Sequence, residues 1–215
     1  MWCIAEITPE YRERMFALLD LYEKPYNKRE PVVCLDESPC QLTQYTKKSI
    51  PAKPGKPGKY DSEYKRLGVT NIFAVVEPLA GKHFPSIRTR KTGADFAIIL
   101  KMISDNYTKA ITIHLVMDNL NTHCEKSVTN YFGLKEGKKL WKRFTVHYTP
   151  KHGSWLDMAE IEISVIKSQA IGKRRIDSEQ ELKKIVKAWS KRANKAESKI
   201  IWTFTKRKAK KKFKL

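Results

Sequence analysis

The chain has 215 residues, a length that suits one hydrophobic core or one core with a small appendage. Hydrophobic residues make up 41% of it and aromatic residues 10%, which excludes a disordered polyelectrolyte despite 31% charged residues. With 43 Lys and Arg against 23 Asp and Glu, the formal net charge is +20. A charge of this sign and size indicates a polyphosphate partner, most often nucleic acid.

Membrane insertion and secretion are not indicated. No apolar run reaches the roughly 18 residues that a membrane-spanning helix needs, and the N-terminal residues lack the charged-then-apolar order of a secretory signal. The four cysteines (Cys3, Cys34, Cys40 and Cys124) form neither a CxxC pair nor a zinc-finger spacing. Reduced thiols are therefore favoured over a zinc site, and we expect a soluble intracellular protein.

The first third of the chain predicts a helix, a strand and a loop. Thr8-Pro9-Glu10 has the N-cap, first-turn proline and first-turn acid of a helix that ends before Lys24. The apolar run 31–36 predicts a buried strand that ends at Asp36. Residues 46–59 contain three prolines, two glycines and five lysines, so we expect a loop there.

The rest of the chain predicts further strands and capped helices. Strands are expected at 67–77, 82–90, 111–118 and 144–148. Helices are expected to begin at four capping patterns: Thr92-x-x-Asp95, Thr122-x-x-Glu125, Ser154-x-x-Asp157 and Ser178-x-x-Glu181. This order predicts an α/β fold with a mixed sheet flanked by helices.

Acidic residues stand out in so basic a chain. Asp36 and Asp118 each end a predicted strand, where ligands collect in α/β sheets. Glu160 and Glu162 lie in a helix that is apolar over much of its circumference, and the helical period does not choose between them. Two aspartates and a glutamate suit magnesium-dependent attack on a phosphodiester. A lone strand-end aspartate is nevertheless more often a turn residue, and Asp118 with Asn119 also fits an Asx turn.

Three segments carry a family resemblance. Residues 33–39 (VCLDESP), 115–123 (LVMDNLNTH) and 147–160 (HYTPKHGSWLDMAE) resemble the three acid-bearing blocks of DDE transposases. The match extends from about Val32 to Trp202 and is nearest to the bacterial insertion-sequence-630-type branch, related to the mariner elements. The resemblance implies a ribonuclease H-like fold, with Asp36, Asp118 and Glu160 as catalytic acids that bind two Mg²⁺ ions, for which Mn²⁺ substitutes.

The same resemblance implies an activity, partners and a location. Enzymes of that family cut double-stranded DNA at terminal inverted repeats and join the freed 3′ end to target DNA. A homodimer, a separate helix-turn-helix half and a prokaryotic cytoplasmic, nucleoid-associated location follow by analogy. We expect an N-terminal helix and linker at 1–30, the catalytic domain at 31–203 and a basic tail at 204–215.

Two further groups of residues have candidate roles. The accessory candidates, which orient a ligand or hold a turn, are Glu37, Asn119, Asn121, His123 (also a candidate proton shuttle) and Asp157. The family usually has Asn at the Asp157 position, and a helix cap is favoured over a fourth ligand there. The DNA-binding candidates are Lys47, Lys48, Lys53, Lys56, Lys59, Lys151, His152, Lys173, Arg174 and Arg175.

Two alternatives to a transposase stay open at this point. The helix-turn-helix modules that precede the catalytic domain in the family have no counterpart before residue 30. That departure leaves room for a non-catalytic DNA-binding remnant or regulator. A different nuclease on the same fold, such as a resolvase or a ribonuclease, is the third candidate.

Overall fold

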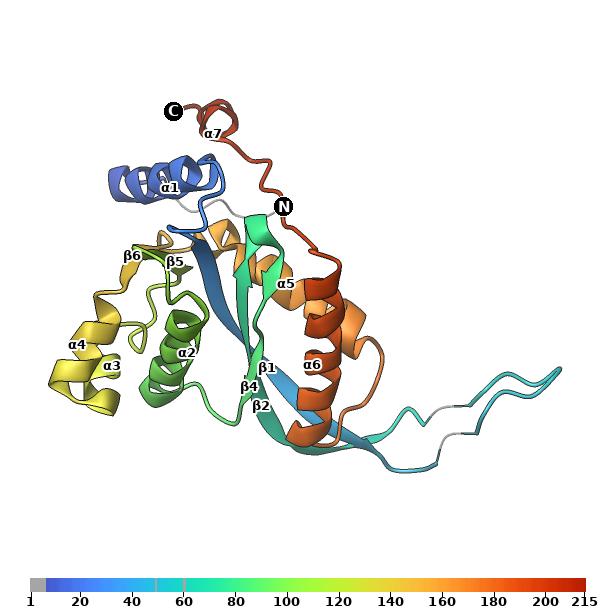
Figure 1. The fold of residues 1–215 in the computed structure, drawn as a ribbon. Helices are drawn as coiled ribbons and strands as arrows, with labels where there is room; N and C mark the ends of the chain where they lie inside the picture. The colour runs from blue at the N-terminus through green and yellow to red at the C-terminus, as the bar shows by residue number, and fades with distance from the viewer. Residues whose placement is uncertain (1–6, 49, 60) are drawn as a thin grey trace.

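A mixed β-sheet forms the centre of the computed structural model, which describes residues 7–48, 50–59 and 61–215 (Figure 1). The strands of the described residues are β1 (Val32–Tyr45), β2 (Tyr64–Glu77), β3 (Lys82–His83), β4 (Ser86–Arg88), β5 (Ile113–Met117) and β6 (Phe144–Tyr148). Their order is β3-β2-β1-β5-β6, and β4 also pairs with β2. The pairs β1–β2, β2–β3 and β2–β4 are antiparallel, whereas β1–β5 and β5–β6 are parallel.

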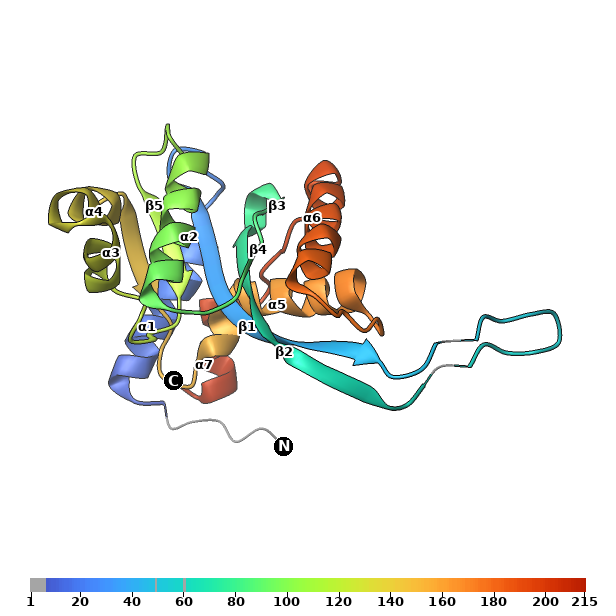
Figure 2. The same ribbon diagram turned by 90° about the horizontal axis from the view of Figure 1, so that it is seen from below.

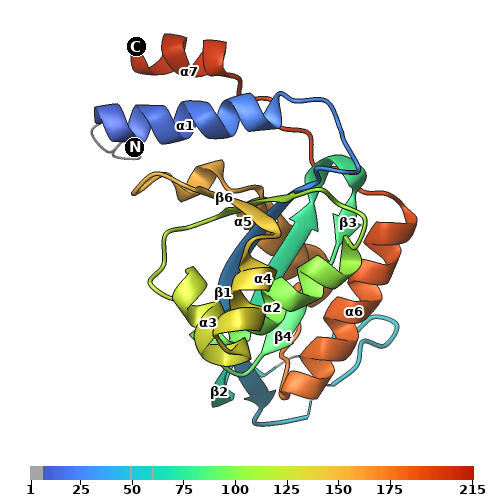
Figure 3. The same ribbon diagram turned by 60° about the vertical axis from the view of Figure 1, so that its left-hand side comes forward.

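Helices cover both faces of this sheet (Figures 1 and 3). The α-helices of the described residues are α1 (Pro9–Tyr22), α2 (Gly93–Asn106), α3 (Glu125–Phe132), α4 (Leu134–Trp141), α5 (Met158–Val165), α6 (Glu179–Lys195) and α7 (Lys206–Phe213). Short 3₁₀ turns occupy Pro78–Ala80 and Ser154–Leu156, and a π-helical segment, Ile166–Ile171, continues α5. None of the helices in the described ranges is both long and apolar enough to cross a membrane.

Strand β1 divides the interior into two apolar clusters because successive side chains point to opposite faces. Val33 and Leu35 pack with α2, α3 and α4 on one face. Cys34 packs on the other face with α1, α5, α6 and Ala209 of α7. The sheet is thus buried on both sides, as expected for a parallel core with crossover helices.

The central sheet confirms the predicted α/β class, but several boundaries were wrong. The strand predicted to end at Asp36 continues to Tyr45, since β2 pairs with it as far as Tyr64. Asp36 therefore lies within a strand. The single strand predicted over 82–90 is two short ones, because Pro85 between them has no N–H to donate.

The predicted caps were partly right. Thr8, Thr92 and Ser178 are N-caps whose side chains accept backbone hydrogen bonds, and Thr92 with Asp95 forms the full capping box. The predicted Ser154 cap is wrong: a 3₁₀ turn occupies that position, and Asp157 caps α5. The predicted Thr122 cap is also wrong, because Cys124 is the N-cap residue of α3.

The C-terminal basic tail is largely helical. Its residues 206–213 form α7, which lies along α1 (Figure 3). Lys206 Nζ is 2.7 Å from a carboxylate oxygen of Asp20 on α1, and Phe213 packs in an aromatic cluster with Trp155 and Phe204. The two ends of the chain therefore cover the same end of the sheet.

The long β1–β2 hairpin projects from the body of the protein (Figures 1 and 2). Its outer end is the predicted Pro/Gly loop, which carries backbone pairs between Ile50 and Lys59 and between Lys53 and Lys56. Arg175 donates to the carbonyls of Asp61, Ser62 and Glu63, and its guanidinium lies 4.4 Å from the Tyr45 ring centroid. This arginine anchors the base of the hairpin.

A histidine pair between β5 and β6 predicts acid sensitivity. His114 Nδ1 and His147 Nε2 are 2.9 Å apart, a hydrogen bond that requires an acceptor nitrogen on one ring. Burial lowers the pKa of both rings, that of His147 to about 4. Histidines of the unfolded chain take up protons near pH 6.5, so the free energy of unfolding falls as the pH decreases below that value.

We expect the contribution of this pair to the free energy of unfolding to fall by about 1 kcal/mol between pH 7 and pH 5, a value that already allows for the partial exposure of both rings. Urea denaturation of the wild type and of His147→Gln at both pH values measures it. The variant should lose less stability on acidification. An equal loss in both proteins would contradict the assignment.

Candidate active site

Backbone pairing brings Asp36 and Asp118 together. Parallel pairing matches Val33 with Leu115 and Cys34 with Val116. Extended two residues beyond its last pair, this register matches Asp36 of β1 with Asp118, which directly follows β5, and Asp118 acts electrostatically on Asp36. Because alternate residues share a face, both aspartates follow Cys34 and Val116 on the face covered by α5.

Helix α5 contributes Glu160 to the same face. Glu160 lies in the first turn and is partly exposed, while Met158, Ala159 and Ile163 of the helix are buried. Asp118 and Glu160 both act electrostatically on Asp36. Burial, followed by repulsion from Glu37, Asp118 and Glu160, raises the pKa of Asp36 to about 7, against a hydrogen bond from the Glu37 amide that lowers it.

Glu162, the alternative glutamate, has a different environment. It is buried, and its Oε1 is 2.8 Å from Nδ1 of His83 on β3. The second ring nitrogen of His83 is 2.9 Å from the Ser198 carbonyl oxygen. Glu162 thus links α5 to β3 and the segment after α6.

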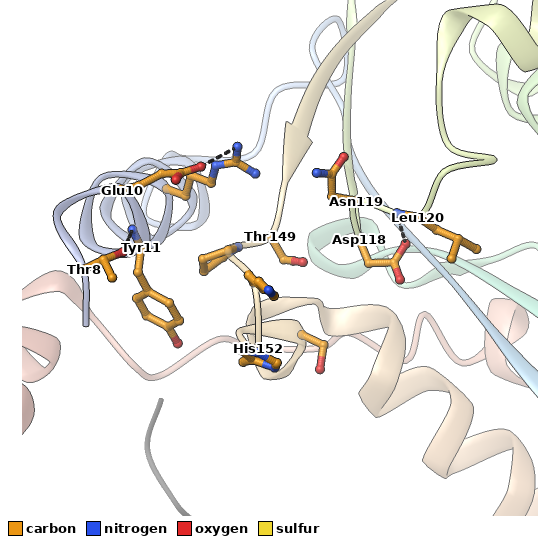
Figure 4. Close-up of a pocket in the computed structure, with 12 residues that line it drawn as sticks. Thr8, Glu10, Tyr11, Asp118, Asn119, Leu120, Thr149 and His152 are labelled. Carbon is orange, nitrogen blue, oxygen red and sulfur yellow. Dashed lines mark hydrogen bonds and ion pairs between the residues drawn. The ribbon is translucent and has the colours of Figure 1, made fainter. Parts of the chain in front are cut away.

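Each aspartate has one oxygen held by the protein. Asp36 Oδ1 accepts from the Glu37 amide at 2.7 Å. Asp118 Oδ1 accepts from the Leu120 amide at 3.2 Å (Figure 4). Oδ2 of either residue accepts no hydrogen bond from the described residues. Carboxylate oxygens are the donors that Mg²⁺ and Mn²⁺ prefer, so the chemistry of these residues fits a divalent cation. Over the described ranges, however, no three or more His, Cys, Asp or Glu side chains are already gathered closely enough to hold a metal ion.

His123 lies between two carboxylates. Its Nδ1 is 2.7 Å from Asp118 Oδ1, and its Nε2 is 2.8 Å from Glu37 Oε1. Burial lowers the pKa of His123, but the hydrogen bonds to the two carboxylates outweigh that effect and raise it to about 10. The hydrogen bond from His123 in turn holds the pKa of Asp118 below its usual range.

A groove of about 900 Å³ opens beside Asp118 (Figure 4). Helix α1 supplies Tyr11 and Arg14 to one wall, and the segment after β6 supplies Lys151 and His152. Asn119 also lines the groove, so two sequence-predicted DNA contacts and one accessory candidate lie next to Asp118. The α1 residues were missed, because no sequence pattern predicts that this helix packs beside the end of β5.

Asp157 has the contacts of a helix cap. Its Oδ1 accepts from the Ala159 amide at 2.8 Å, and its Oδ2 has no partner among the residues described. The side chain is buried beside Cys34, and burial raises its pKa well above the usual range, with added repulsion from Asp36 and Glu160.

Comparison with known protein families decides the class of the protein. A family model described as "DDE superfamily endonuclease" matches residues 31–183, most of the chain and all three acids. The chain belongs to this superfamily. The nuclease and transposase class predicted from the three sequence blocks is therefore confirmed.

Solved structures show the fold of this DDE endonuclease. The catalytic domain of Mos1 mariner transposase matches with a TM-score of 0.56 and 12% identity over 94% of this chain and 100% of that one. A Mos1 paired-end complex with the left transposon end matches with a TM-score of 0.58 and 14% identity over 94% and 66%. A Mos1 mariner paired-end complex with Mn matches with a TM-score of 0.59 and 16% identity, and the match covers 89% of this chain and 58% of that one.

These matches confirm the ribonuclease H-like fold class. The DDE endonuclease spans two thirds or less of the two full transposase chains. No curated protein sequence matches.

The remaining predicted residues do not line the groove beside Asp118. Lys47, Lys48, Lys53, Lys56 and Lys59 are all exposed on the projecting hairpin loop. Arg174 donates to the carbonyls of Ala170 and Ile171, and the exposed Lys173 precedes it. The Asn121 carbonyl accepts from the Cys124 thiol at 3.4 Å, a local contact in the turn before α3.

Asp157, the buried N-cap residue of α5, predicts an unusual pH dependence of the free energy of unfolding. The unfolded chain ionises Asp157 near pH 4 while the folded protein resists ionisation, so its contribution to stability is lost as the pH rises above 4. Asp157→Asn keeps a cap oxygen without the charge and should be more stable than wild type at pH 8, with a smaller difference at pH 4. Asp157→Ala should lose about 1 kcal/mol of cap energy. Urea denaturation tests all three proteins. A wild type more stable than Asp157→Asn at pH 8 would show that the folded protein favours the charged carboxylate.

Proposed function

We propose that this DDE endonuclease is the catalytic domain of a transposase. In this proposal it cleaves double-stranded DNA at the terminal inverted repeats of its element and joins the freed 3′ end to target DNA. One observation carries the proposal: β1, β5 and α5 direct Asp36, Asp118 and Glu160 to one face, and each aspartate keeps one oxygen outside the protein's own hydrogen bonds.

Two Mg²⁺ or Mn²⁺ ions are the cofactors proposed for this site. Complexes of the similar Mos1 protein have been solved with Mn and with Mg. Two ions held by these acids would supply activation of the attacking oxygen and stabilisation of the leaving oxygen of a phosphodiester. Asp36 and Asp118 supply the Oδ2 donors in this scheme, and Glu160 supplies the third carboxylate. Burial is the main cause of the raised pKa of Asp36, and a bound cation would offset the smaller contribution from repulsion by Glu37, Asp118 and Glu160.

Basic residues lie in the groove beside Asp118 and on the projecting hairpin, two places where duplex DNA could contact them. Lys151 and His152 line the groove at Asp118, and five lysines lie along the projecting hairpin loop. Contacts of this type bind phosphates without reading bases. Recognition of the repeats is assigned to a separate helix-turn-helix half, and paired cutting of two ends to a homodimer.

Removing any one of the three carboxylates should abolish cleavage. We expect Asp36→Asn, Asp118→Asn and Glu160→Gln to lower Mn²⁺-dependent cleavage by about 10³-fold or more, because each loses a charged ligand. The substrate is a supercoiled plasmid that carries the sequences flanking the coding region. Joining of a 3′-hydroxyl oligonucleotide to a second plasmid measures strand transfer.

The matched control is Asp105→Asn, an exposed aspartate on α2 whose partner is Lys101. It should cleave like the wild type. DNA binding, measured by gel shift, should persist in all four variants. Full activity of Asp118→Asn would exclude the proposed mechanism.

Metal binding should depend on pH through Asp36. Its pKa of about 7 means that the protein must release a proton for that carboxylate to bind a cation. We expect the affinity for Mn²⁺ to rise about tenfold between pH 6 and pH 8. Calorimetry in buffers of different ionisation enthalpy counts the released protons. An affinity that is constant over this range would contradict the assignment of Asp36 as a ligand.

A non-catalytic DNA-binding protein is the second candidate. The observation that favours it is that the described residues hold no cluster of three ligands already gathered around a metal position. Such a protein would bind DNA with an affinity that falls about 10³–10⁵-fold between 50 and 200 mM salt, if it neutralises six to ten phosphates. It would nick no plasmid with any divalent ion. The cleavage assay above therefore separates the two candidates.

A further inference from the structure

A chain of three side chains, of which Glu37 and His123 are buried, runs from the far face of β1 to Asp118. From the geometry of Glu37, His123 and Asp118, we infer that Glu37 and His123 are positioning residues that hold Oδ1 of Asp118 and leave Oδ2 to bind the cation. This inference rests on the proposed function, which supplies the divalent cation. Glu37 and His123 would act on that cation through Asp118 and would not bind it themselves.

The side chains of Glu37 and Asp36 lie on opposite faces of the sheet. Because neighbouring residues on a strand point in opposite directions, Asp36 lies on the α5 face and Glu37 on the α2 face. The Glu37 side chain is 5% exposed, and its Oε1 is 2.8 Å from His123 Nε2. The Glu37 carboxylate therefore reaches Asp118 through the imidazole, while the Glu37 backbone amide donates to Asp36 Oδ1.

The imidazole is held on all sides. His123 is 1% exposed, and its ring stacks on Phe96 of α2 at a centroid distance of 4.7 Å. Its carbonyl oxygen accepts from the Tyr148 hydroxyl at 2.7 Å. Strand β1 and helix α2 thus hold the ring, and Tyr148 of β6 holds the backbone of His123. The same ring contacts the carboxylate of Asp118.

Both ring nitrogens of His123 are used. Nε2 faces Glu37, and Nδ1 lies 2.7 Å from the side chain and 3.3 Å from the carbonyl oxygen of Asp118. Two carboxylate acceptors require an N–H on each nitrogen. Since neither nitrogen is left for a substrate, His123 is a positioning residue rather than a proton shuttle.

Asp118 needs such a support more than Asp36 does. Asp36 pairs with Ala74 in the β1–β2 ladder, and the residues before and after it in the chain are also paired with β2. Its backbone is therefore fixed. Asp118 follows the last residue of β5, and its side chain is 43% exposed. Without the ring, the Leu120 amide is the only other hydrogen bond from the described residues to its carboxylate. Partners of this kind typically change metal affinity by 10- to 100-fold.

Mn²⁺ binding without DNA gives a test that is separate from catalysis. Electron paramagnetic resonance of free Mn²⁺ measures the affinity of the full chain. We expect Glu37→Ala to weaken binding by about 10- to 100-fold. Glu37→Gln keeps an acceptor oxygen for Nε2 and should stay within about threefold of the wild type. In the cleavage assay, excess Mn²⁺ should restore the rate of Glu37→Ala.

The chain contains a matched control. His83 and Glu162 form a second buried pair with the same 2.8 Å separation, and neither contacts Asp118 within the described structure. His83→Ala should lower the free energy of unfolding but leave the Mn²⁺ affinity unchanged. If Glu37→Ala does not fold, His123→Asn replaces it, because the shorter amide cannot span both carboxylates and the same loss is expected.

The outcomes separate this inference from the proposed function. Wild-type Mn²⁺ affinity in Glu37→Ala or His123→Asn, with the protein folded, overturns the positioning role while leaving the proposed function intact. If the wild type neither binds Mn²⁺ nor cleaves DNA, the proposed function fails. Crystal structures of the wild type and of the folded variant, without metal, then decide the inference: a turned Asp118 carboxylate supports it, and an unchanged one overturns it.

Discussion

The parallel pairing of β1 with β5 is the constraint on which the site depends. Three residue pairs, from Val32–His114 to Cys34–Val116, align two segments about 80 residues apart in the chain. Parallel neighbours need a crossover connection, and here β2, β3, β4 and α2 lie between β1 and β5 in the chain. A shift of this register by one residue would move Asp118 away from Asp36 and turn one apolar set to the wrong face.

The site combines carboxylates that repel one another with a histidine that stabilises the charge on one of them. Burial and, after it, repulsion from Glu37, Asp118 and Glu160 raise the pKa of Asp36, whereas the hydrogen bond from His123 lowers the pKa of Asp118. Neighbouring acids with opposite pKa shifts are typical of functional sites. The basic residues of the groove and the hairpin lie outside this acidic centre, where they counter its repulsion of a polyanion.

The ends of the chain complete the groove. Helix α1 provides one wall, and α7 packs along α1 through Lys206 and an aromatic cluster that includes Trp155. Trp155 also donates to the Tyr11 hydroxyl at 3.1 Å. Segments outside the family match at 31–183 thus support the segment that leads into α5 and its Glu160.

The sequence alone determined what depends on local pattern and on a few recognisable blocks. Apolar runs and caps predicted most strands and helices, and the blocks around Asp36, Asp118 and Glu160 predicted the superfamily. Helix boundaries near Ser154 and Thr122 were wrong because competing turns form there. Tertiary structure decided that Glu162 pairs with His83, that Arg175 anchors the hairpin, and that Glu37 reaches Asp118 through His123. These contacts join residues far apart in the chain, and packing against the sheet brings them together, a constraint that no spacing within one segment encodes.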